Sequence, residues 1–168
     1  TPLRYFKQTT HEGGIRVPLI AAGPGVKGGA SNDSMLHVTD LAVTFLDVAG
    51  LGHPSKTNDK LAAPTGKSLA PLFAGTTNAV RNDSDWLGEE LFGNRSIRQG
   101  EWKILNLIKG AGGSGEWELF NLKSDPGETT DLAKSNPAKL KELVALWDIY
   151  EKDNGVVLTD DGPFKKKN

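Results

Sequence analysis

The sequence predicts an α+β fold: a partial α/β edge (one strand plus helices), then a small antiparallel sheet of about four strands covered by a C-terminal helix. Three observations predict it. A short apolar run and helical periodicity occupy the first half, short β-rich segments separated by glycine turns occupy the second, and one long amphipathic segment lies near the end. With 168 residues, the chain is long enough to bury a sizeable core.

The apolar run is residues 17–22, and a turn rich in glycine and proline follows it. An unbroken apolar run is typical of a strand that is covered on both faces, as in a parallel sheet. One strand does not make a sheet, so its neighbouring strands are expected outside this chain.

Two helices are predicted in the first half. Thr39 is the expected N-cap of a helix over residues 40–49, whose apolar face consists of Leu41, Phe45 and Val48. A second, short helix is expected to begin at Ser68 and to end by Gly75.

The second half predicts an antiparallel meander, with strand candidates at residues 91–92, 95–98, 102–108 and 117–120. Asn136 then caps a helix that has Pro137 at its first position. Apolar side chains recur along this helix at spacings of three or four and should cover one face of the sheet: Leu140, Leu143, Val144, Trp147 and Tyr150.

A polar stretch near residues 76–85 predicts the boundary between the two halves. All four tryptophans follow it, at positions 86, 102, 117 and 147. The expected organisation is a first domain over 1–80, a second over 81–155, and a loose tail over 156–168.

The composition argues against several classes of function. The formal charge is −1, so a nucleic-acid partner is not expected, and no apolar run is long enough for a membrane partner. The absence of cysteine excludes disulfides and Cys-ligated metals. The three histidines show no metal-ligand spacing, so no metal site is predicted within this chain.

Gly66-Lys67-Ser68 lacks the upstream glycine and strand of a phosphate-binding loop, and Ser68 is better explained as a helix cap.

The most informative segment is residues 5–18, YFKQTTHEGGIRVP. Gly13 and Gly14 permit a sharp turn, and Glu12 and Arg16 are placed to pair across it. Lys7 then lies on a loop before the predicted strand, where its ammonium can face an anion. From composition alone, a solvated surface lysine is the more common interpretation.

This segment resembles the K-x-T-T-[YH]-E-G-G-x-R-x-P element of the sulfatase family, in the alkaline-phosphatase superfamily. Four later segments resemble further elements of the family in the same order, and the likeness is greatest to bacterial arylsulfatases: residues 37–41, 66–72, 97–103 and 117–133. The resemblance covers about residues 1 to 154. It identifies the chain as similar to the C-terminal portion of a sulfuric ester hydrolase.

The resemblance implies a role for one residue of this chain. In the family, the lysine five positions before the glutamate of E-G-G contacts the sulfate, and Lys7 is five positions before Glu12. It implies that Glu12, Gly13, Gly14 and Arg16 are the structural support of that site.

The same resemblance implies that other parts of the active site lie elsewhere. The family's nucleophile is a formylglycine made from the Cys or Ser of C/S-x-P-x-R, and its Ca²⁺ or Mg²⁺ is held by Asp and Asn residues, all upstream of the lysine element. An upstream catalytic domain is therefore the expected partner, with a sulfate ester as substrate. The chain alone is expected to be inactive and, because its apolar surface would be exposed, to self-associate. Alternatives are a phosphodiesterase or phosphonate hydrolase of the same superfamily, or a stand-alone interaction module.

Overall fold

The computed structural model describes residues 2–158, which form two compact units. The sheet unit contains residues 2–18 and 83–158, and the helical unit is Leu19–Asn82. The N-terminal segment that carries Lys7 thus belongs to the sheet unit, although the residues that follow it directly in the sequence form the helical unit. The predicted domains over 1–80 and 81–155 concern the larger enzyme and stay predictions. Most of the predicted tail lies outside the described residues.

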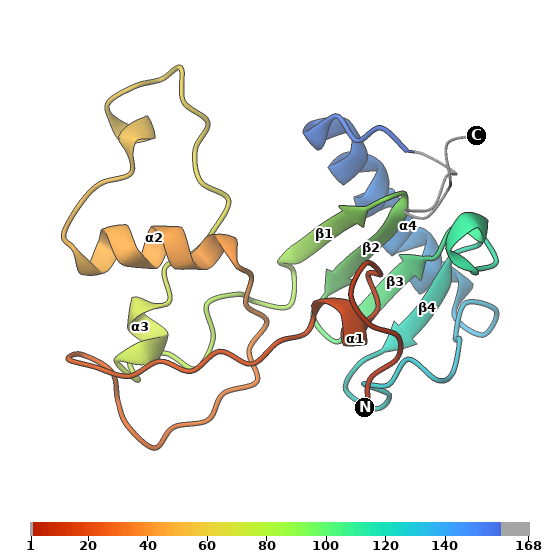
Figure 1. Ribbon diagram of the computed structural model, residues 1–168, viewed down its shortest axis with the longest axis horizontal. Coiled ribbons are helices and arrows are strands. Elements are labelled where there is room, and N and C mark those ends of the chain that lie inside the picture. The colour runs from red at the N-terminus through yellow and green to blue at the C-terminus, as the bar shows by residue number, and fades with distance from the viewer. Residues whose placement is uncertain (1, 159–168) are drawn as a thin grey trace. The chain divides into compact units, whose positions relative to one another are not determined.

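The sheet unit is built on a four-stranded antiparallel sheet (Figure 1). The strands are β1 (Trp86–Leu91), β2 (Asn94–Gln99), β3 (Trp102–Asn106) and β4 (Glu118–Asn121), paired in the order β1-β2-β3-β4. This order confirms the predicted meander. The first strand was misplaced, however, because the prediction at 91–92 falls on its end and on the turn to β2. Phe92 and Gly93 both have positive φ there, which suits a tight hairpin.

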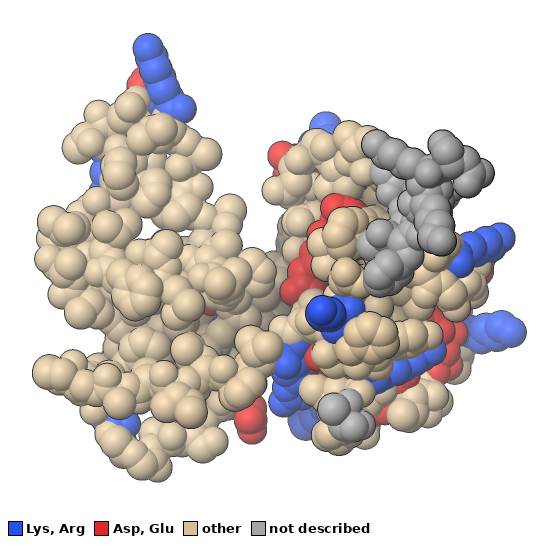
Figure 2. All heavy atoms as spheres, in the orientation of Figure 1, with Lys and Arg blue, Asp and Glu red and all other residues tan. Residues whose placement is uncertain are grey.

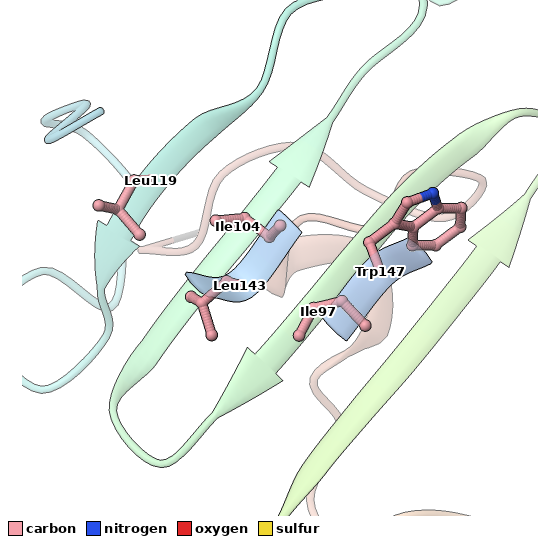
Figure 3. Packing of buried hydrophobic residues seen from close by; sticks show 5 residues of the cluster. All are labelled: Ile97, Ile104, Leu119, Leu143 and Trp147. Carbon is pink, nitrogen blue, oxygen red and sulfur yellow. The ribbon is translucent and has the colours of Figure 1, made fainter. Parts of the chain in front are cut away.

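Helix α4 (Pro137–Asn154) packs on one face of this sheet, as its apolar stripe predicts. The core beneath it is formed by Ile97, Ile104 and Leu119 from the strands with Leu143 and Trp147 from the helix (Figure 3). Asn136 is the N-cap residue, but its side chain accepts no hydrogen bond from the first turn.

The other face of the sheet holds the N-terminal segment and the short helix α1 (Glu12–Ile15). Side chains alternate along a strand, so the neighbours of the core residues in β3 point to this face. Two of them, Lys103 and Leu105, are fully buried. Leu105 packs with Phe120 and Leu122 in a second, smaller apolar cluster.

The helical unit contains α2 (Thr39–Val48), the 3₁₀ turn η1 (Pro54–Lys56) and α3 (Ala70–Phe73). The predicted strand over 17–22 is wrong, since these residues form no regular structure. A strand needs a neighbour for its backbone hydrogen bonds, and no described segment pairs with this one. Val17 and Ile20 are consequently 79% and 89% exposed.

Two details of the predicted helices also need correction. Val38, not Thr39, is the N-cap of α2, and the carboxylate of Asp40 accepts the amide of His37 at 2.8 Å. In α3 the N-cap is Leu69, although Ser68 Oγ does accept the amide of Ala70 at 3.2 Å. The predicted end of this helix at Gly75 is confirmed by the left-handed backbone of that residue.

Two residues of the predicted apolar face of α2 are exposed in this unit, Phe45 by 68% and Val48 by 72%, whereas Leu41 is partly buried. The buried side chains of this helix are instead Asp40 and Thr44, on the neighbouring face. Figure 2 shows charged side chains gathered over the sheet unit, whereas most of the visible surface of the helical unit is uncharged. No described helix has the length and apolar character needed to span a membrane.

Candidate functional site

Lys7 lies on an exposed turn whose backbone is unusual on both sides. Tyr5 and Gln8 have φ angles of 59° and 77°, in the left-handed region that non-glycine residues rarely adopt. The turn is held in place by hydrogen bonds, since Thr9 Oγ1 donates to the carbonyl of Phe6 at 3.0 Å. Lys7 itself forms no ion pair with any residue between 2 and 158.

Asn94 attaches this turn to the sheet. Its side chain is fully buried, and its Nδ2 donates to the carbonyl of Gln8 at 3.0 Å. Its Oδ1 accepts the amide of Ile108 at 3.2 Å. One amide side chain therefore joins the start of β2, the segment after β3 and the residue next to Lys7.

The two glycines of the E-G-G element are required by space rather than by a left-handed backbone. Both lie within α1, and neither has a positive φ. A Cβ on Gly13 would lie 2.3 Å from the carbonyl oxygens of Arg4 and Tyr5, and one on Gly14 would lie 2.2 Å from that of Thr9. The amide of Gly13 donates to the carbonyl of Arg4 at 3.0 Å. The glycines thus let α1 pack directly against the backbone of the turn that carries Lys7.

Glu12 is buried, and its carboxylate belongs to a cluster of charges beneath the turn. Lys103 Nζ lies 2.8 Å from Glu12 Oε1 and 2.8 Å from Glu128 Oε1, and all three side chains are almost fully buried. Glu128 Oε2 also accepts the backbone amide of Glu12 at 2.8 Å. The predicted pair of Glu12 with Arg16 exists at 3.9 Å, but it is longer and half exposed.

The charges of this cluster are not balanced within the buried space. Two carboxylates face one ammonium, and Arg16 approaches only from the surface. Burial raises the pKa of the Glu128 carboxyl, while the charge of Lys103 and its hydrogen bond oppose that rise. Removing Lys103 would leave both carboxylates without their buried counter-ion.

His11 is also fully buried next to this cluster. Its ring lies 4.4 Å from that of Tyr5, and neither of its nitrogens has a hydrogen-bond partner within residues 2–158. Burial, with the nearby charges of Arg4 and Lys103, lowers the pKa of His11 to about 3. The imidazole is therefore neutral at pH 7.

The structure thus places Glu12, Gly13 and Gly14 in α1 and Arg16 at its C-cap, with Lys7 on the turn that packs against this helix. Lys103 and Glu128 were missed as site residues, although both lie in segments that resemble the sulfatase family. A signal was present in the sequence, because a lysine within an apolar strand requires an acidic partner when it is buried.

Gly66-Lys67-Ser68 has a structural role in the helical unit. The amide of Lys67 donates to Asp40 Oδ1 at 2.9 Å, and Arg81 binds both oxygens of the same carboxylate at 2.6 Å. Burial alone would raise the pKa of Asp40, but the hydrogen bonds from Arg81, Lys67 and His37 lower it below its ordinary value. The amide of this loop is therefore engaged by the carboxylate of Asp40, which gives the loop a structural role.

A divalent metal has no complete site among the described residues. Between residues 2 and 158, no three His, Asp or Glu side chains come together in a way that could hold an ion. The residues in this part of the chain therefore do not fit a metal centre of their own.

The antiparallel sheet, its covering helix and the E-G-G turn define a C-terminal domain of the sulfatase type. The family described as N-sulphoglucosamine sulphohydrolase, C-terminal, matches residues 3–148. The chain belongs to this family of C-terminal sulfatase domains.

Similar proteins agree with this assignment. An uncharacterized sulfatase of Schizosaccharomyces pombe is 37% identical over 95% of this chain and 29% of its own length. Human arylsulfatase K is 32% identical over 80% of this chain and 25% of its own length. The crystal structure of Ps i-CgsB is 28% identical, with a TM-score of 0.71, over 91% of this chain and 32% of that protein. The chain thus spans less than a third of the length of each of these proteins.

Proposed function

We propose that this chain supplies one active-site residue, Lys7, to a sulfuric ester hydrolase, in which the Lys7 ammonium contacts the sulfate group of the substrate. The observation that carries the proposal is the contrast between Lys7 and its surroundings. Its side chain is exposed and without an ion pair in the described structure, while the side chains from Thr9 to Glu12, which begin two positions later, are buried. A lysine that only faces solvent does not require a buried, hydrogen-bonded segment beside it.

The chemistry of ester hydrolysis explains why a fixed cation is useful there. Negative charge grows on the leaving oxygen as the S–O bond breaks, and the sulfate oxygens are already anionic. A preorganised ammonium lowers the free energy of that transition state more than that of the bound substrate. Lys7 acts in this role through its positive charge alone.

The supporting residues act through position. Gly13 and Gly14 allow the close approach of α1, and Glu12 connects α1 to Lys103 in β3. Arg16 covers the outer side of the Glu12 carboxylate. Together these residues would hold the Lys7 turn in a fixed position relative to the sheet.

The remaining chemistry is assigned outside this chain. By family resemblance, an upstream catalytic domain holds the formylglycine nucleophile and Ca²⁺ or Mg²⁺, and this chain alone has no hydrolase activity. The metal would supply charge stabilisation and nucleophile activation there.

Turnover of 4-nitrophenyl sulfate by the complete enzyme tests the proposal. Lys7→Ala should lower kcat/KM by about 100- to 1000-fold, as expected for losing one preorganised charge at the reacting group. Lys123→Ala removes an exposed lysine of the same unit and should leave kcat/KM unchanged. Equal activities of Lys7→Ala and Lys123→Ala would overturn the role of Lys7. Faster turnover of bis(4-nitrophenyl) phosphate than of the sulfate would favour the phosphodiesterase alternative.

A further inference from the structure

A pocket of about 340 Å³ lies at one end of the sheet, where the β2–β3 pair meets the glycine-rich loop before β4. It is lined by Arg95, Asn106, Ile108, Lys109 and Gly115. Arg95 and Asn106 are paired across the two strands, so they present their side chains on the same face. A pocket of this size can accommodate a small molecule such as a monosaccharide.

The pocket lies on the face of the sheet that α4 covers. Asn94 and Arg95 are consecutive in β2, so they point to opposite faces. Asn94 holds the carbonyl of Gln8 on the face of the N-terminal segment, whereas Arg95 lies against Trp117 and Trp147. The Lys7 turn and this pocket are thus on different faces of the sheet.

Arg95 is a cation without a counter-ion among residues 2–158. Its guanidinium lies over the rings of Trp117 and Trp147, at 5.3 and 5.9 Å from their centroids, and it forms no ion pair with any described residue. Its Nε is buried and has no hydrogen-bond partner in the described part of the chain. The aromatic contacts hold the guanidinium in place but leave its N–H groups to be satisfied by an acceptor.

Asn106 contributes the opposite kind of group. It is 2% exposed, and its Nδ2 donates to the carbonyl of Gly115 at 2.7 Å. Its Oδ1 is buried and accepts no hydrogen bond from residues 2–158. A buried amide oxygen without a donor is costly, so a ligand with a hydroxyl group would gain free energy by donating to it.

We propose that this pocket binds a small hydroxylated oxyanion, of the kind found in a sugar that carries a sulfate, phosphate or carboxylate. The oxyanion accepts from Arg95 and is attracted by Lys109, whose side chain is exposed at the rim. A neighbouring hydroxyl donates to Asn106 Oδ1. The proposal does not depend on the role of Lys7, and nothing in it requires hydrolysis.

The experiment is a titration of this chain with glucose 6-sulfate, inorganic sulfate and glucose. Indole fluorescence and ¹⁵N resonances report on the site, because two tryptophans contact Arg95. Glucose 6-sulfate should give a saturable change that includes Arg95 Nε–H. Sulfate should bind more weakly, since it lacks the hydroxyl, and glucose should not bind.

Variants at Lys109 and Asn106 separate the contributions of these two side chains to binding. Lys109→Ala should weaken binding of glucose 6-sulfate about tenfold, which is typical for loss of one charged contact. Asn106→Ala should weaken binding of glucose 6-sulfate but not that of sulfate. Lys134→Ala, which removes an exposed lysine that does not line the pocket, should change neither affinity.

Three results would overturn the assignment. These are no saturable response to glucose 6-sulfate, equal affinities of Lys109→Ala and Lys134→Ala, or equal affinities of wild type for sulfate and for its sugar ester. Loss of binding in Lys7→Ala with normal binding in Lys109→Ala would place the ligand at the Lys7 turn instead. That outcome would overturn the pocket while supporting the proposed function, so the two failures are distinguishable.

Discussion

Lys103 and Glu12 are 91 positions apart in the sequence, yet Nζ of one lies 2.8 Å from Oε1 of the other, with both side chains buried. The contact joins the second residue of β3 to the first residue of α1. It connects the sheet to the segment that carries Lys7, and Glu128 completes the cluster from the other side. The stability of the sheet unit should therefore depend on this charge cluster.

Replacing Lys103 by methionine should destabilise the sheet unit by about 3 to 5 kcal/mol, because two buried carboxylates then lose their counter-ion. Urea unfolding followed by tryptophan fluorescence measures this, since all four tryptophans lie in the sheet unit. The double variant Lys103→Met/Glu128→Gln also removes one of the two unpaired carboxylate charges. Its free energy of unfolding should therefore fall by less than the sum of the decreases in the two single variants. Additive losses would show that the three groups do not act as one cluster.

His11 should make the stability of the sheet unit depend on pH. Its folded pKa of about 3 is below the 6.5 of an ordinary imidazole, so the unfolded chain binds more protons between these values. Stability should therefore fall as pH decreases from 6.5 towards 3, and this one group contributes up to about 1.4 kcal/mol per pH unit.

Comparison with His11→Phe isolates the contribution of this residue, because the phenyl ring keeps the contact with Tyr5 but takes up no proton. Unfolding free energies at several pH values between 4 and 7 should have a smaller slope in this variant. His53→Gln removes a histidine of the helical unit and should retain the slope of the wild type. Identical slopes for His11→Phe and wild type would show that folding does not change the pKa of His11.

The sequence predicted the antiparallel meander and α4 because their signals are local. Glycine turns separate short strands, and the apolar stripe of α4 has a helical period. The strand over 17–22 was predicted by the same reasoning and did not form. A run such as Val17 to Ile20 becomes a strand only when neighbouring strands are present to pair with it, and composition contains no information on that.

The candidate site could be predicted only in part, for a related reason. Glu12, Gly13 and Arg16 are adjacent in the sequence and form one motif. Lys103 and Glu128 reach Glu12 through the fold, so their contact depends on the register of β3 and on the course of the chain after β4. The register is a tertiary property, and local pattern does not determine it.

Gly13→Ala should destabilise the sheet unit by about 2 kcal/mol or more, because its Cβ would lie 2.3 Å from two backbone carbonyl oxygens. Gly127→Ala is a suitable control, since the nearest atom to its Cβ would be 3.2 Å away. The free energy of unfolding of this control, measured in urea, should fall by less than about 1 kcal/mol. Similar losses for the two variants would mean that α1 can move away from the turn, and the packing argument for the E-G-G element would then fail.

The exposed apolar face of α2 should make this chain self-associate. Phe45 and Val48 are largely exposed on one side of the helix, and Leu51 beyond its end is 62% exposed. Sedimentation velocity should show concentration-dependent association of the wild type, and Phe45→Ser/Val48→Ser should shift the distribution towards monomer. Ile149→Ser removes a half-exposed apolar side chain from α4 and should not have this effect. Two results would contradict this prediction: a strictly monomeric wild type at high concentration, or an equal decrease in association in Ile149→Ser and in the α2 variant. Either result would mean that the apolar residues of α2 do not form the associating surface.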